Sequence, residues 1–89
     1  MIEIRLNGYR MTDKVTTHEY LKEKLSLPEY YGNNLDALWD CLSTDFSQKK
    51  INIYYSDKII ENLGSYGKLI IKLFREISRE NGSIEVNIY

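Results

Sequence analysis

Residues 28–42 read PEYYGNNLDALWDCL, and this stretch decides how the rest of the chain is arranged. Pro28 ends any preceding helix at or before Leu27, because its ring restricts the residue before it. Asn33 is a good cap for a second helix, which the apolar spacing after it predicts. The stretch therefore predicts two helices joined by a loop that contains residues 30–32.

Three segments outside this stretch alternate apolar and polar residues. They are residues 2–6, 51–55 and 84–88. A period of two is typical of a strand with one buried face. Each segment is therefore predicted to be a strand.

Further helices are predicted between these strands. A capping box from Thr16 to Glu19 is expected to open the first helix. A short helix is expected over residues 56–63. A longer one begins near Tyr66 with a clear apolar stripe and stops at Asn81-Gly82.

This order of elements predicts the fold class. Strands separated by helices imply parallel pairing with right-handed crossovers. Clean alternation in the strands indicates that only one sheet face is covered. We expect an α/β fold in two layers, with a three-stranded parallel sheet and helices packed on one face. The 89 residues suit a single domain, residues 1–89.

Composition excludes several classes of protein. No apolar run approaches the ~20 residues that span a bilayer, and the charged N-terminus is unlike a signal peptide. We therefore expect a cytoplasmic protein without a membrane partner. A single cysteine cannot form a disulfide within the chain. One cysteine and one histidine cannot supply a typical zinc site, so no metal or cofactor is expected. Nucleic acid is disfavoured as a partner, because the pair Lys49-Lys50 is isolated and typical of a solvated loop.

Charge is unevenly distributed although the formal net charge is only −1. Residues 25–48 contain no Lys or Arg but four acidic residues, whereas the remainder holds all twelve basic ones. An acidic patch on a nearly neutral protein suggests a basic partner.

The second predicted helix carries this acidity beside a core-facing side. At ~100° per residue, its apolar side chains cluster on one side, and Asp36 and Asp40 lie together on another flank. The apolar set is Leu35, Leu38, Trp39 and Leu42. The paired carboxylates fit a cation-binding surface or a plain solvated face. The loop pair Tyr30-Tyr31 likewise fits an interface or the cover of a core edge.

The stretch from Leu27 to Leu42 resembles the barstar family, intracellular inhibitors of the secreted bacterial ribonuclease barnase. The strings LPEYYG and NLDALWDCL carry the resemblance, which continues more weakly around residues 21–22 and 74–76. It implies a two-layer fold with a three-stranded parallel sheet. It also implies a protein that is not an enzyme, but blocks a basic extracellular ribonuclease in a 1:1 complex and is a monomer when free.

The resemblance also implies which residues contact the ribonuclease. The matching positions are Tyr30, Gly32, Asn34, Asp36, Trp39, Asp40 and Glu76. Asp40 matches a carboxylate that mimics an RNA phosphate, Tyr30 a tyrosine packed on the catalytic histidine, and Glu76 a peripheral ion pair. Trp39 is expected to be chiefly structural, with only its edge reaching the partner.

The chain departs from the family after the second helix. Family members have an aromatic residue at the position of Thr44 or Asp45, whereas the aromatic here is Phe46. The following loop is also shorter and lacks proline. Contacts beyond Asp40 are therefore expected to differ.

Other functions stay open on the residues alone. An immunity protein of the same fold, directed at a different toxin or nuclease, depends on rim residues that vary. A hydrolase using Asp36, Asp40 and Glu76 would need a cleft that so small a domain has little volume to form. A thiol enzyme using Cys41 and His18 is disfavoured because Cys41 lies in mid-helix and His18 on an apolar side.

Overall fold

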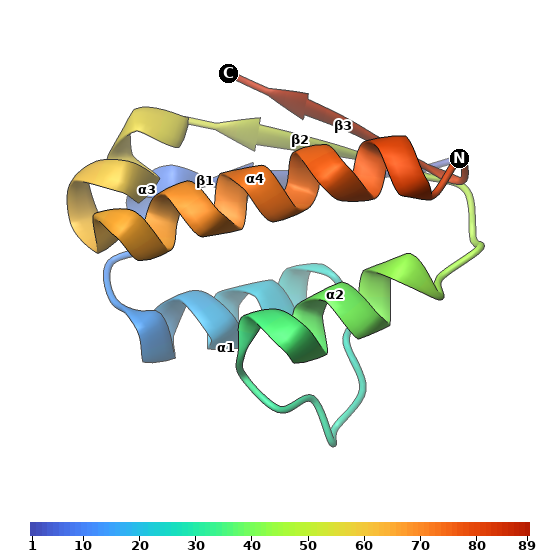
Figure 1. Cartoon of the computed structure of the whole chain (residues 1–89), viewed down its shortest axis with the longest axis horizontal. Helices are drawn as coiled ribbons and strands as arrows, with labels where there is room; N and C mark the ends of the chain where they lie inside the picture. Colours follow the sequence, from blue (N-terminus) through green and yellow to red (C-terminus); the bar gives the residue numbers. More distant parts are fainter.

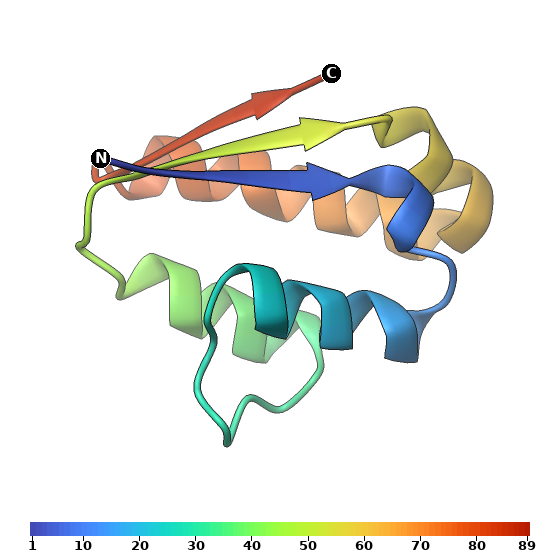
Figure 2. The same cartoon turned by 180° about the vertical axis from the view of Figure 1, so that it is seen from behind.

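A computed structural model describes all residues from Met1 to Tyr89. The elements, in chain order, are β1 (Ile2–Asn7), the 3-10 turn η1 (Gly8–Arg10), α1 (Lys14–Lys24), α2 (Leu35–Ser43), β2 (Lys49–Tyr54), α3 (Ser56–Leu63), α4 (Ser65–Glu80) and β3 (Ile84–Ile88). The three strands form one parallel sheet in the order β1-β2-β3. The helices lie on one side of it: α4 runs alongside the strands, α1 contacts β1, and α2 packs against α4 (Figures 1 and 2). This confirms the predicted α/β fold.

The register explains why one sheet face is apolar. Ile4, Ile51 and Val86 are aligned across the three strands on the face that α4 covers. The next aligned row is Glu3, Lys50 and Glu85, which points to the opposite, polar face. Side chains that alternate along each strand thus bury one row and solvate the next.

The core lies between this apolar sheet face and the helices. It contains 17 buried apolar residues drawn from every helix and strand. Phe74 at the middle of α4 is fully buried, and so are Leu38 and Leu42 of α2. Helix α2 is therefore anchored by one side only, which leaves its other side available.

Close contact between α3 and α4 depends on one glycine. A Cβ atom on Gly67 would lie 2.4 Å from the carbonyl oxygen of Ile59. Any larger residue there would push the start of α4, which includes Tyr66, away from α3.

Several predicted boundaries are wrong. Helix α1 begins at Lys14, because Asp13, and not Thr16, is its N-cap and accepts the Thr16 amide at 2.8 Å. Strand β2 begins two residues early, at Lys49, and ends at Tyr54. Ile2, the first residue of β1, and Tyr55, which follows β2 with a φ of 56°, belong to segments predicted to have one buried face but are more than half exposed.

Helices α3 and α4 match their predicted positions closely. The stop at Asn81 is confirmed, since Asn81 is the C-cap of α4. Leu69, however, is 49% exposed although it was placed in the apolar stripe. No helix combines the length and apolarity that crossing a bilayer requires.

Candidate functional site

The loop between α1 and α2, residues 25–34, is held by short local hydrogen bonds. The Leu27 amide donates to the Lys22 carbonyl at 2.9 Å, and the Tyr31 amide donates to the Pro28 carbonyl at 2.9 Å. Ser26 and Asn33 adopt left-handed backbone angles, with φ of 53° and 54°. Such angles are rare outside glycine, so the surrounding contacts must hold the backbone in this shape. We call this segment the α1–α2 loop.

The two tyrosines of the loop have opposite environments. Tyr31 is only 6% exposed, and its hydroxyl oxygen lies 2.7 Å from Nδ1 of His18. Tyr30 is 87% exposed. One tyrosine therefore covers the core, and the other offers an aromatic ring to a partner at little cost in lost core packing.

The joint between the loop and α2 is built by Asn34 and Gly32. Asn34 is the N-cap of α2: its Oδ1 accepts the Ala37 amide at 2.7 Å, and its Nδ2 donates to the Gly32 carbonyl at 3.2 Å. The predicted cap, Asn33, is therefore wrong by one residue, because Asn33 takes the left-handed position before the helix. A Cβ atom on Gly32 would lie 3.3 Å from the side-chain Nδ2 of Asn34. Asn34 thus caps α2 and binds the Gly32 carbonyl, and a side chain at position 32 would crowd that cap.

Asp36 and Asp40 lie exposed on α2, one helical turn apart. Neither carboxylate lies within ion-pair distance of a basic group of this chain. Asp36, in the first turn, is stabilised by the helix dipole, whereas Asp40 lies beyond that turn. The pair therefore forms an uncompensated anionic surface.

Two surface hollows flank these carboxylates. One, of about 460 Å³, lies between the α1–α2 loop and α2 and is lined by Tyr30 and Asp40 among others. The second, of about 260 Å³, lies between α2 and α4 and is lined by Asp36, Trp39 and Glu76 among others. A larger hollow beside β1 shares no residue with this set. The structure thus brings six of the seven predicted site residues to the two sides of α2 and its N-terminal joint, and places Glu76 across the second hollow.

Trp39 lies in the wall of the second hollow, which we call the α2–α4 groove. Leu38 and Leu42 are fully buried, but Trp39 and Leu35 are only partly buried. Trp39 packs against the core and has an open side, which agrees with the expectation that only its edge is available to a partner.

Glu76 contributes to the groove from α4 but is not free of counter-charge. Its Oε1 lies 4.0 Å from Nζ of Lys72, one turn earlier, and 38% of its side chain is exposed. Lys72 lines the same groove. The acidic surface is thus interrupted by one cation at this edge, which the sequence pattern did not single out.

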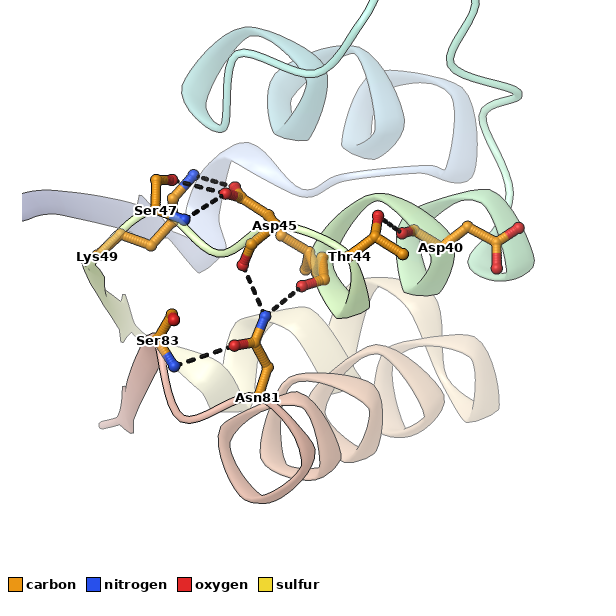
Figure 3. A network of polar contacts seen from close by, with 8 residues as sticks. Asp40, Thr44, Asp45, Ser47, Lys49, Asn81 and Ser83 are labelled. Atoms are coloured by element: carbon orange, nitrogen blue, oxygen red, sulfur yellow. Dashed lines mark hydrogen bonds and ion pairs between the residues drawn. The ribbon is translucent and has the colours of Figure 1, made fainter.

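The segment after α2 differs from the expected interface because it is used for structure. Asp45 makes an ion pair with the buried Lys49, and its Oδ1 accepts from the Ser47 amide at 3.0 Å. The side-chain Nδ2 of Asn81 donates to the Asp45 carbonyl at 2.7 Å and to the Leu42 carbonyl at 2.9 Å (Figure 3). This set, which we call the Asp45 network, ties the end of α2 to β2 and α4.

The Asp45 network corrects the prediction made for Lys49. Lys49 is a buried strand residue with its charge paired, and not part of a solvated loop. Burial alone would raise the pKa of Asp45, but hydrogen bonds from Lys49 and Ser47 outweigh it and hold the pKa below its usual value. Phe46 is 74% exposed beside this network, so its ring adds nothing to the core.

Features expected of an enzyme are not assembled. Burial, together with the nearby Asp40, raises the pKa of the Cys41 thiol, which lowers its fraction of thiolate. Both ring nitrogens of His18 lie within 2.7 Å of tyrosine hydroxyls, so neither is free to act as a base on Cys41. Asp36 and Asp40 stand on an exposed helix face, where water screens both.

Known proteins match this chain over most or all of its length. The family model described as Barstar (barnase inhibitor) matches residues 1–89. A protein of Bacillus subtilis (strain 168), named "Putative ribonuclease inhibitor YrdF", is 35% identical over 82 residues, which cover 90% of this chain and 89% of that protein. Members of this family are inhibitors and not enzymes. On its sequence, its three-stranded parallel sheet and these matches, the chain belongs to the barstar family.

Proposed function

We propose that this chain inhibits a basic, barnase-like secreted ribonuclease by covering its active site with α2 and the α1–α2 loop. The complex is 1:1, and Asp40 occupies the place of an RNA phosphate. The observation that carries this proposal is the pair of exposed carboxylates on α2, with no counter-ion in the chain, beside the exposed ring of Tyr30.

The electrostatics of α2 favour a cationic pocket as its partner. A ribonuclease active site must hold phosphates, so it gathers Arg and Lys side chains. A carboxylate that enters such a pocket gains charge-assisted hydrogen bonds, and Asp40 breaks no ion pair of its own to do so. Barnase and barstar are themselves the standard example of such charge-pair hot spots, so the size of the effect is carried over from the family.

The other site residues take supporting roles in the proposed interface. Tyr30 supplies rigid aromatic area at one side of Asp40. Asp36 and the open edge of Trp39 face the partner over the α2–α4 groove, with Glu76 at its rim. Gly32 and Asn34 contribute through the backbone shape that they fix between loop and helix.

The same proposal takes residues 1–89 as one folded domain that acts as a monomer. One continuous core of 17 residues, to which every helix and strand contributes, supports the single domain. Size-exclusion chromatography with light scattering tests it, and a stable dimer of the free protein would contradict it.

Titration against a barnase-like enzyme tests the inhibitor function. Hydrolysis of an RNA substrate should fall linearly with added protein and stop near one equivalent. Asp40→Ala should abolish this stoichiometric inhibition. The matched control is Asp57→Ala, which removes an exposed aspartate from another helix, α3. Equal inhibition by both variants, with the fold intact, would contradict the phosphate-mimic mechanism.

A second candidate is an immunity protein of this fold whose target is a different nuclease or toxin. The Asp45 network favours it, because this chain uses for internal structure the positions where the family has an aromatic contact. Lys72 adds a cation at the opposite edge. Inhibition of another nuclease at one equivalent, with no effect on barnase-like enzymes, would select this candidate.

A further inference from the structure

The single histidine of the chain lies at the junction of three elements. His18 of α1 is only 1% exposed. Its Nδ1 lies 2.7 Å from the hydroxyl oxygen of Tyr31 in the α1–α2 loop, and its Nε2 lies 2.6 Å from that of Tyr66 in α4. The two contacts join His18 to tyrosines that are 13 and 48 positions away along the chain.

The direction of the two hydrogen bonds follows from burial. A neutral imidazole has one nitrogen that donates and one that accepts. The Tyr31 hydroxyl is buried and has no other acceptor, so its hydrogen must go to Nδ1. Tyr66 is only partly buried, so its hydroxyl can accept from Nε2–H and pass its own hydrogen to water. These directions correspond to a neutral ring with the proton on Nε2.

We propose that His18 is a positioning residue for the α1–α2 loop: it accepts from Tyr31 and donates to Tyr66, and so fastens the loop that carries Tyr30 to α4. This rests on the proposed function, in which Tyr30 and its loop contact the ribonuclease. A loop already held in its bound shape loses less conformational entropy on binding. The two hydrogen bonds that His18 makes with Tyr31 and Tyr66, which we call the clamp, would thus favour rapid and tight association although His18 itself does not touch the partner.

The surroundings of His18 oppose its protonation. Tyr31 faces it from the loop and Tyr66 from α4, while Nζ of Lys14 on α1 lies 4.6 Å from the centre of the Tyr66 ring. Burial raises the pKa of Tyr31, and the nearby Tyr66 and Cys41 of α2 add to the rise. No carboxylate pairs with the ring, and burial lowers the pKa of His18.

Protonation would undo the clamp on the loop side. With both ring nitrogens donating, the hydrogen of the buried Tyr31 hydroxyl loses its acceptor. Because the folded-state pKa lies below 6.5, the clamp's contribution to stability is complete above that pH. It is lost as the pH falls through the lower folded-state value.

The test uses free protein and three matched tyrosine variants. Tyr31→Phe and Tyr66→Phe each keep the ring and remove one hydroxyl from the clamp. Tyr20→Phe is the control, because its hydroxyl accepts the amide of Asn7, at the end of β1, at 2.9 Å and makes no hydrogen bond to His18. Hydrogen exchange of the Tyr31 amide, which is bonded to the Pro28 carbonyl, reports on loop order. Chemical shifts of the His18 ring nitrogens report on the tautomer.

The expected result is a proton on Nε2 and exchange of the Tyr31 amide about tenfold faster in both clamp variants than in the control, at matched global stability. In the parent, the protection of the Tyr31 amide, taken relative to its intrinsic exchange rate at each pH, should also fall as His18 is protonated. A proton on Nδ1, or loop exchange that the clamp variants leave unchanged, would overturn the proposal. Association with a barnase-like enzyme is measured separately for Tyr66→Phe. Absence of any binding by the parent would count against the proposed function alone, because the exchange data do not need a partner.

Discussion

The carboxylates of Asp40 and Asp45 lie five residues apart in the sequence and in opposite surroundings. Asp40 is exposed and has no basic partner in the chain, and its side chain points away from the neighbouring polar contacts (Figure 3). Asp45 is partly buried, paired with Lys49 and bonded to Ser47. The chain uses the carboxylate of Asp45 in its fold and leaves that of Asp40 without an internal partner, which supports the proposal that Asp40 binds a cationic partner.

The largest expected effect is on binding by Asp40→Ala. This change should cost on the order of 5 kcal/mol, the size that such charge pairs have in the barnase–barstar system itself, mostly as faster dissociation. Stability should be unchanged or a few tenths of a kcal/mol higher, because repulsion from Asp36 disappears. Stopped-flow dissociation and thermal melting measure the two quantities. A large drop in melting temperature would mean that Asp40 belongs to the fold, and would erase the contrast with Asp45.

The opposite result is expected for Asp45→Asn. Loss of this charge leaves the buried ammonium of Lys49 without a counter-ion and should lower stability by about 2–3 kcal/mol. The matched control is Glu85→Gln, which breaks the exposed pair with the adjacent Lys50 and should cost under about 0.5 kcal/mol. Urea unfolding at neutral pH compares them.

Acid gives a second test of the Asp45 pair. The folded-state pKa of Asp45 is lowered, so its contribution is complete above the unfolded value of 3.8 and lost as the pH falls through the lower folded value. The stability difference between the parent and Asp45→Asn should therefore shrink in that range. A difference that stays constant down to low pH would show that the loss came from packing and not from charge.

Local patterns predicted most of the fold. Alternation in residues 84–88 and the apolar stripe of α4 each depend on neighbours along the chain, and both were placed correctly. The start of α1 was misplaced because Asp13 and Thr16 are both good caps, and a pattern cannot decide between two caps three residues apart. The strand ends were predicted less well, because alternation along the chain does not show where burial stops: Ile2 fits the pattern and is 56% exposed.

The site was predictable where the resemblance covered it and obscure where contacts are long-range. The helical wheel gave the correct flank for Asp36 and Asp40, because they share one helix. It could not reveal that α4 leaves the side of Trp39 open. It also could not reveal that His18 contacts Tyr66, 48 residues away. Those features arise only when the elements pack.

The smallest expected effect on binding is that of Glu76→Ala, at the rim of the proposed interface. Glu76 is partly hydrated and already has Lys72 within 4.0 Å, so Glu76→Ala should cost less than about 1 kcal/mol of binding. Lys72→Ala is the matched control: it removes the cation from the same groove, and should leave affinity equal or slightly better for a basic enzyme, with faster association at low salt. Dissociation and association rates at two salt concentrations resolve both changes. If Glu76→Ala and Asp40→Ala caused equal, small losses, the acidic surface of α2 would be an ordinary solvated face. The comparison between Asp40 and Asp45 would then say nothing about a partner.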